Sequence, residues 1–205
     1  MSPIRWLLGT LLIYLICFAS LSSAAEIERK NGYILLEGEI VEGDLNRLRA
    51  RLLKYGNLGV ALNSPGGSLG EALKIGSFIR TSGLATHIPK SATCASACVT
   101  IFAGGLIRTA HPDSNIGIHM ASAVFNDSFV QGMEAVISEY GTEATPYVVA
   151  MFEELAASAM LRQVYFILQA GVSLRLLEAT ISVPHDEIFW MSIDDAISVN
   201  LINFY

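Results

Sequence analysis

A serine with small neighbours stands near the middle of the chain, where it could act as a nucleophile. Ser96 lies between Ala95 and Ala97, at the start of a segment predicted to form a buried helix. There its hydroxyl would be exposed beside backbone N–H groups that favour a developing negative charge. The small neighbours would let a substrate carbonyl approach. The ordinary alternative is that Ser96 is a helix N-cap.

A histidine that could serve as the base follows in a short predicted strand. His119 ends the apolar segment 116–119, and a histidine at the end of a strand is well placed to take a proton. The alternative is a structural histidine held by hydrogen bonds. His87 and His111 are weaker candidates, because one lies inside a predicted strand and the other beside a turn proline.

Lysine usage separates two kinds of serine chemistry. A serine nucleophile can be activated by a lysine further along the chain instead of a histidine. No lysine follows Lys90, which precedes Ser96 by six residues and is wrongly placed for such a pair. The residues therefore favour a serine–histidine arrangement.

A glycine-rich turn could supply hydrogen-bond donors to the same chemistry. The segment Asn63-Ser-Pro-Gly-Gly67 follows a short apolar strand and precedes a predicted helix. Two glycines let backbone N–H groups face outward, where they could hold a phosphate or stabilise an oxyanion. No nucleotide-binding glycine motif is present, so we expect no nucleotide. The alternative is an ordinary strand-to-helix turn.

Taken together, these segments resemble a known family. Asn63-Ser-Pro-Gly-Gly67, Cys94-Ala-Ser-Ala97 and Pro112-Asp-Ser-Asn-Ile-Gly-Ile-His119 are similar, in order and approximate spacing, to the Clp proteolytic-subunit (ClpP) family of serine peptidases, which has a crotonase-like fold. The resemblance runs from about residue 33 to residue 119 and returns loosely over residues 191–202. It implies an α/β fold, a ClpP-like spiral of ββα units with a mainly parallel sheet, plus a C-terminal helical region.

The resemblance also implies roles for single residues. Ser96 would be the nucleophile and His119 its base, with the backbone amides of Gly67 and Ala97 as the oxyanion hole. It implies self-association into a homo-oligomer and a peptide or unfolded protein as substrate. It implies neither a cofactor nor a metal.

The acidic member of the implied catalytic triad is the weakest match. An ungapped alignment at residues 191–192 puts Ile188 where the family has an aspartate. A shift of one or two residues would bring Asp186 or Glu187 there, and Asp186 is favoured because its side chain is the family's type. An incomplete triad, with a water or a backbone carbonyl in place of the acid, is the third possibility.

Two cysteines bracket the candidate nucleophile. Cys94 and Cys98 could form a disulfide across a turn-to-helix junction, or remain two small buried side chains. A zinc site that uses both with a histidine is disfavoured, because the chain has no second cysteine pair.

Alternating strands and helices must position these residues. We expect strands at 33–40, 59–62, 85–88, 106–110 and 116–119, with helices from Asp44, over residues 69–79, and after Ser96. This alternation favours βαβ units and a parallel sheet. Residues 125–168 read as mainly helical, and a strand with a capped helix ends the chain. Residues 25–205 therefore form a single predicted domain.

The first residues read as an export signal. Arg5 precedes an apolar run over residues 6–20, and small residues follow, so residues 1–24 are predicted to be a signal peptide. We expect a periplasmic or secreted protein in an oxidising compartment. The alternative is a retained N-terminal membrane anchor, which is the only contact with a membrane that we expect.

Charge and composition narrow the classes of function. The chain has 205 residues, of which 52% are hydrophobic, and a net charge of −6, which argues against binding to nucleic acid. The leading hypothesis is an exported, ATP-independent serine peptidase. The alternative is a catalytically silent crotonase-fold module that binds peptides or assembles with a partner, and acyl-thioester chemistry is a third possibility.

Overall fold

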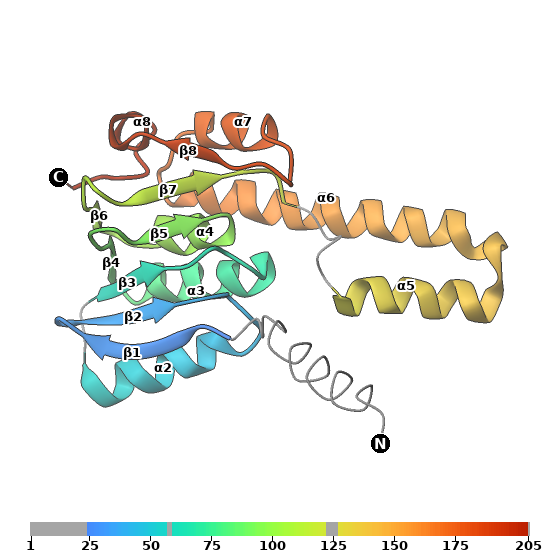
Figure 1. Ribbon diagram of the computed structural model, residues 1–205, viewed down its shortest axis with the longest axis horizontal. Helices are drawn as coiled ribbons and strands as arrows, with labels where there is room; N and C mark the ends of the chain where they lie inside the picture. The colour runs from blue at the N-terminus through green and yellow to red at the C-terminus, as the bar shows by residue number, and fades with distance from the viewer. Residues whose placement is uncertain (1–23, 57–58, 122–126, 205) are drawn as a thin grey trace, which may run out of the picture.

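Two β-sheets form the body of the protein (Figure 1). The computed structural model describes residues 24–56, 59–121 and 127–204, so nearly all of the predicted signal peptide lies outside the described residues. The larger sheet has the strand order β1 (Glu26–Lys30), β2 (Tyr33–Glu37), β3 (Gly59–Asn63), β4 (Ala85–Ile88), β6 (Arg108–Ala110). The smaller sheet has the order β5 (Thr93–Ala95), β7 (Asn115–Ile118), β8 (Phe189–Met191).

Most strand pairs are parallel, as the alternation of elements predicts. The pairs β2–β3, β3–β4, β4–β6 and β5–β7 are parallel, whereas β1–β2 and β7–β8 are antiparallel. Parallel neighbours require long crossovers, and three helices lie in these connections. They are α2 (Asp44–Tyr55), α3 (Leu69–Thr81) and α4 (Ala97–Ala103).

The strand β1 and its hairpin with β2 were not predicted from the sequence. β1 pairs with β2 through the turn residues Asn31 and Gly32, which both have positive φ angles of 52° and 84°. Asn-Gly is the sequence most typical of such a two-residue turn. The signal for this hairpin is therefore present in the sequence itself.

The core lies between the larger sheet and the helices. Alternate side chains of β2 are buried, and Val60 and Leu62 of β3 are fully covered. Helices α2 and α3 supply Leu48, Ile75 and Ile79 to the same cluster. Burial of each such side chain stabilises the fold by about 1.5–3 kcal/mol.

The predicted helical region divides into a hairpin of two helices. α5 (Asp127–Tyr140) and α6 (Thr145–Gln169) are joined by the short turn η1 (Thr142–Ala144), and Gly141 breaks the helix with a φ of 76°. Figure 1 shows α5 and the first part of α6 extending beyond the body, while the end of α6 packs on it through Phe166 and Ile167. The hairpin lies between β7 and β8 in the chain.

The end of the chain agrees with its sequence pattern. α7 (Arg175–Ile181) precedes β8, and α8 (Ile193–Ser198) follows it. The side chain of Ser192 accepts a hydrogen bond from the Asp195 N–H, which confirms the predicted helix cap. No helix within residues 24–56, 59–121 and 127–204 is long and apolar enough to cross a membrane.

Candidate active site

Ser96 and His119 stand at the same edge of the smaller sheet. Ser96 directly follows β5 and His119 directly follows β7, and these two strands run parallel with Ala95 opposite Gly117. The Ser96 N–H donates to the Gly117 carbonyl at 2.9 Å. Because parallel strands bring their carboxyl ends to one edge, the fold brings the predicted nucleophile and base to the same edge of the sheet.

The backbone of Ser96 adopts a conformation that few residues other than glycine tolerate. Its φ is 56° and its ψ is −126°, at the sharp junction between β5 and α4. Such conformations cost about 1–3 kcal/mol and concentrate at functional sites. The Ser96 side chain makes no capping hydrogen bond to α4, so the N-cap interpretation does not account for this hydroxyl.

The glycine turn after β3 packs directly against Ser96. A Cβ atom added to Gly66 would lie 2.7 Å from the Ser96 Cβ and 3.1 Å from the Ala97 nitrogen. Gly66 has a φ of 110°, which suits glycine. Only a residue without a side chain allows this approach, so the turn must contain glycine here.

Two backbone amides near Ser96 have no partner among the described residues. The Gly66 N–H donates to the Ser64 hydroxyl, and the Gly66 carbonyl accepts from Ile40. No hydrogen bond donated by the Gly67 or Ala97 N–H is found in the described part of the chain. Ala97 begins α4, where the first N–H groups have no intrahelical acceptor. These two residues are the predicted oxyanion hole.

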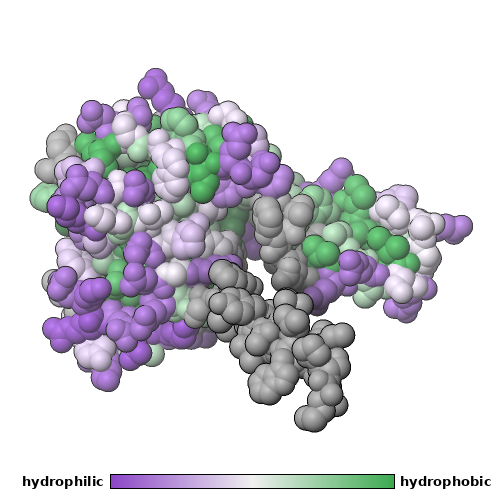
Figure 2. Space-filling model, in the orientation of Figure 1, coloured by the Kyte–Doolittle hydropathy of each residue, from purple (hydrophilic) through white to green (hydrophobic). Residues whose placement is uncertain are grey.

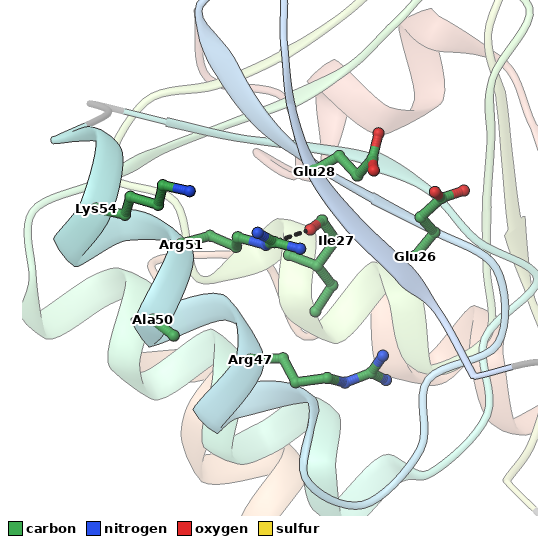
Figure 3. A pocket seen from close by; sticks show the side chains of 7 residues that line it. All are labelled: Glu26, Ile27, Glu28, Arg47, Ala50, Arg51 and Lys54. Carbon is green, nitrogen blue, oxygen red and sulfur yellow. Dashed lines mark hydrogen bonds between the residues drawn. The ribbon is translucent and has the colours of Figure 1, made fainter.

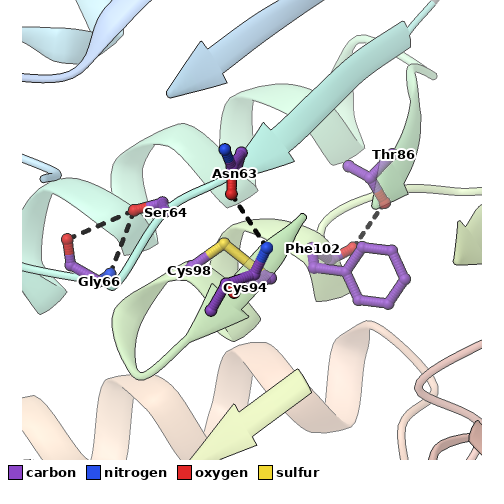
Figure 4. The surroundings of a disulfide bond; sticks show 8 residues. Asn63, Ser64, Gly66, Thr86, Cys94, Cys98 and Phe102 are labelled. Atoms are coloured by element: carbon purple, nitrogen blue, oxygen red, sulfur yellow. Dashed lines mark hydrogen bonds between the residues drawn. A yellow bond between two sulfur atoms is a disulfide. The ribbon is translucent and has the colours of Figure 1, made fainter. Parts of the chain in front are cut away.

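A disulfide holds the junction that carries Ser96. Cys94 at the middle of β5 is bonded to Cys98 in the first turn of α4, with 5.2 Å between their Cα atoms, and both side chains are fully buried (Figure 4). Ser64 of the glycine turn is hydrogen-bonded to β5. Its N–H donates to the Thr93 carbonyl, and its carbonyl accepts from the Ala95 N–H. The nucleophile junction and the glycine turn are therefore tied together.

The acidic partner expected for His119 is not in place. The Nδ1 atom of His119 is buried and has no hydrogen-bond partner among the described residues. Asp186 and Glu187 are exposed, in a turn where the Glu187 N–H donates to the Pro184 carbonyl at 3.1 Å. Neither carboxylate therefore makes a hydrogen bond to the His119 Nδ1 atom in this structure.

Two of the other histidines, His87 and His111, lie away from this edge. His111 follows β6 and precedes β7, so it is at the opposite end of β7 from His119, with the Asp113 carboxylate 3.8 Å from its Nδ1. His87 of β4 stacks on Tyr33 and bonds the Thr109 hydroxyl at 2.8 Å. Burial of its ring lowers the pKa of His87. Neither side chain joins the Ser96 site.

One hollow of the described surface lies apart from the Ser96 junction. A groove of about 430 Å³ runs between β1 and α2 (Figure 3). In it the Arg51 guanidinium donates to the Ile27 carbonyl, and Arg47 donates to Ala25. Its lining contains neither Ser96 nor His119.

Comparison with known proteins identifies the fold. No protein-family model matches the chain, and no curated protein matches it. Among solved structures, the chain is similar to a point mutant of ClpP1 from Listeria monocytogenes, with a TM-score of 0.52 and 20% sequence identity. The match covers 82% of this chain and 87% of that one. The predicted ClpP-like α/β fold with a mainly parallel sheet is confirmed.

Proposed function

We propose that this protein is a serine peptidase that cleaves exposed peptide segments without ATP, with Ser96 as nucleophile and His119 as base. One observation carries the proposal. Ser96 sits in a strained junction, against the Gly66–Gly67 turn, at the sheet edge that also ends in His119. The ClpP-like fold is consistent with this chemistry.

The residues suit acyl transfer. The Ser96 oxygen would attack the peptide carbonyl carbon while His119 takes the hydroxyl proton, and His119 would return that proton to the leaving amine. The resulting ester would be hydrolysed by water in the reverse sequence. The N–H groups of Gly67 and Ala97 would donate to the oxyanion, and loss of one such donor typically costs about 2.7–4 kcal/mol of transition-state stabilisation.

Labelling with a fluorophosphonate probe tests the nucleophile. We expect the purified protein to be labelled, with the modified peptide containing Ser96 by mass spectrometry. Ser96→Ala should abolish the labelling, and His119→Ala should slow it by roughly a hundredfold or more. Wild-type protein that takes no label, or Ser96→Ala that labels equally, would refute the proposal. Cleavage of casein or short peptides then measures the peptidase activity itself.

A silent binding module is the second candidate. The observation that favours it is the His119 Nδ1 atom, which has no acceptor among the described residues. If the protein only binds peptides, Ser96→Ala should bind them and function in cells as well as the wild type does. A loss of cellular function in Ser96→Ala, with unchanged folding, supports the enzyme.

We also propose that the protein is exported and that residues 1–24 are removed. The Cys94–Cys98 disulfide supports this, since such bonds persist mainly in oxidising compartments. N-terminal sequencing of the protein from fractionated cells tests it. A start at residue 25 or 26 in the periplasmic or secreted fraction is expected. An intact N-terminus in the membrane fraction would show an anchor instead.

A further inference from the structure

The pairing of β7 with β8 decides which residue stands next to His119. These strands are antiparallel, with Gly117 opposite Trp190 and Ile118 opposite Phe189. The next step in the same register puts His119 opposite Ile188. Side chains of alternate residues share a face of a strand, so His119 and Gly117 project to the face that Ile188 and Trp190 occupy.

Contacts at Gly117 agree with this placement. A Cβ added to Gly117 would lie 2.7 Å from Cγ2 of Ile188 and 2.8 Å from the Trp190 ring. Both side chains therefore lie over the glycine that precedes His119 by two residues. The face beside the imidazole is apolar where an acidic side chain would be needed.

Backbone hydrogen bonds fix the turn that carries the neighbouring acids Asp186 and Glu187. The Met120 N–H donates to the Val183 carbonyl at 2.9 Å, which fixes the start of the turn before β8. Glu187 closes that turn onto Pro184. For Asp186 to stand opposite His119, β8 would have to slip by two residues, which would break the pairs that Phe189 and Trp190 make.

The chemistry of imidazole gives this arrangement a consequence. A neutral imidazole carries one hydrogen, and it can accept the serine proton at Nε2 only when that hydrogen is on Nδ1. The buried Nδ1 atom of His119 has no acceptor for such a hydrogen among the described residues. An acceptor would select the Nδ1–H tautomer, and without one the tautomer that can take the serine proton at Nε2 is not favoured.

We propose that Ile188 is a positioning residue that occupies the place of the acidic partner of His119, and so keeps the Ser96–His119 pair slow. The inference rests on the proposed peptidase function. The proposed site differs from the implied catalytic triad. Ile188 occupies the position of the acidic member, and neither Asp186 nor Glu187 takes part.

The test is to supply the missing acceptor in the full protein. In Ile188→Asp we expect fluorophosphonate labelling of Ser96 to accelerate by roughly tenfold or more. We also expect a strongly downfield proton resonance from the His119 Nδ1–H, absent from the wild type. Ile188→Asn offers an uncharged acceptor and should accelerate labelling less, and Ile188→Val should change neither readout. Residue 188 is 43% exposed, so the polar variants should fold, which circular dichroism verifies.

Two further variants test the wild-type site. Asp186→Asn and Glu187→Gln should label at the wild-type rate. If either slows labelling, an acid reaches His119 in solution and the inference is overturned. It is also overturned if folded Ile188→Asp lacks the downfield resonance.

The resonance separates this inference from the proposed function. If the resonance appears in Ile188→Asp but no variant takes the label, the role of Ile188 is supported and the peptidase proposal fails. If the wild type takes the label but Ile188→Asp shows no resonance, the peptidase proposal holds and the inference about Ile188 fails.

Discussion

Gly67 shows how one residue type can decide the geometry of a site. Its φ of 132° lies in the region that side chains avoid, and an added Cβ would overlap the carbonyl oxygen of Ile40. Only glycine therefore fits both this backbone conformation and this close contact with Ile40. Its N–H is also one of the two unpaired donors beside Ser96.

Substitution of Gly67 should disturb both folding and labelling. We expect Gly67→Ala to lower the free energy of unfolding by about 1–3 kcal/mol and to slow the labelling of Ser96 strongly. Gly70→Ala is a matched control, since Gly70 in α3 has only the Ser68 hydroxyl near its Cβ position, at 3.9 Å. Urea unfolding and labelling rates measure the two effects. Equal behaviour of the two variants would contradict the role of Gly67.

Among the structural elements, the junction of β5 with α4 is the one that the site depends on most. The disulfide links the strand to the first turn of the helix and encloses Ser96 between its two ends. A short covalent loop of this kind restricts the unfolded chain and also limits how far the strained serine can relax. Stability and reactivity should therefore depend on the same bond.

Removal of the disulfide should reduce stability and labelling together. For a loop this short, chain entropy predicts a loss of about 2 kcal/mol in the Cys94→Ala/Cys98→Ala double variant. We expect thermal unfolding at a lower temperature and slower labelling of Ser96. A phosphine reductant should slow the wild type in the same way and leave the double variant unchanged. An undiminished labelling rate in the reduced wild type would show that the disulfide is not needed to hold Ser96 in its reactive conformation.

The start of α2 depends on an acid from α3. Glu71 is 2% exposed, and its Oε1 accepts hydrogen bonds from the N–H groups of Gly43 and Leu45 at 3.2 and 2.8 Å. Burial alone would raise the pKa of Glu71, but the Leu45 N–H and the Lys74 ammonium outweigh it and lower the pKa below its usual 4.5. The ionised carboxylate thus joins the two helices.

This lowered pKa makes a prediction about pH. An acid whose folded-state pKa is depressed contributes stability above its unfolded pKa and loses that contribution as the pH falls through the folded value. Glu71→Gln should lower stability at neutral pH by about 1 kcal/mol and flatten the decline below pH 4.5. Urea unfolding across that range measures it, with Glu154→Gln at an exposed position of α6 as control. Parallel pH profiles for Glu71→Gln and wild type would contradict the assignment.

At the scale of the whole molecule, Arg108 joins segments that are far apart in the chain. Its side chain is only 1% exposed, and its guanidinium donates to the carbonyls of Gly105, Ala170, Asn200 and Leu201. These contacts connect β6 to the end of α6 and to the C-terminal segment. Burial, with a smaller contribution from Arg80, lowers the pKa of Arg108 to about 10.

Arg108→Met should destabilise the whole fold. Each carbonyl would lose a charge-assisted hydrogen bond worth about 1.5–3 kcal/mol, so we expect the free energy of unfolding to fall by more than about 3 kcal/mol. Arg49→Met is the control, because Arg49 is exposed and stacks on Phe78, a contact worth about 1 kcal/mol or less. A loss no larger than that of the control would show that the carbonyls find other donors.

The projecting hairpin is the surface best suited to self-association. Figure 2 shows apolar side chains gathered on its projecting part. Nearer the body, Leu161 and Tyr165 of α6 are 69% and 65% exposed. They line a hollow of about 420 Å³ together with Val164 and Leu168. Apolar area of this kind is unusual on a surface that stays uncovered. We therefore propose that copies of the chain associate through α6.

Light scattering tests this proposal. The wild type should be oligomeric at micromolar concentrations, and Leu161→Glu/Tyr165→Glu should lower the measured mass to that of the monomer. Leu53→Glu on α2 should leave the mass unchanged, although Leu53 is more exposed than either residue. A monomeric wild type would exclude a role of the hairpin in self-association.

Local chemistry allowed much of this protein to be predicted from its sequence. The glycine turn, the serine with small neighbours and the alternation of strands and helices each depend on residues close together in the chain. The Asn31–Gly32 hairpin is equally local and could have been found in the same way. The division of the helical region at Gly141 could also have been anticipated.

The tertiary structure alone decided what surrounds Ser96 and His119. The contact of Gly66 with Ser96 joins two turns that follow different strands, and the buried Nδ1 of His119 reflects the pairing of β7 with β8. Whether Asp186 or Ile188 faces the imidazole depends on register, and register is set by packing and hydrogen bonds along the entire strand. The sequence near Asp186 permits either outcome. Only the register of β7 with β8 in the folded sheet brings Ile188 opposite His119.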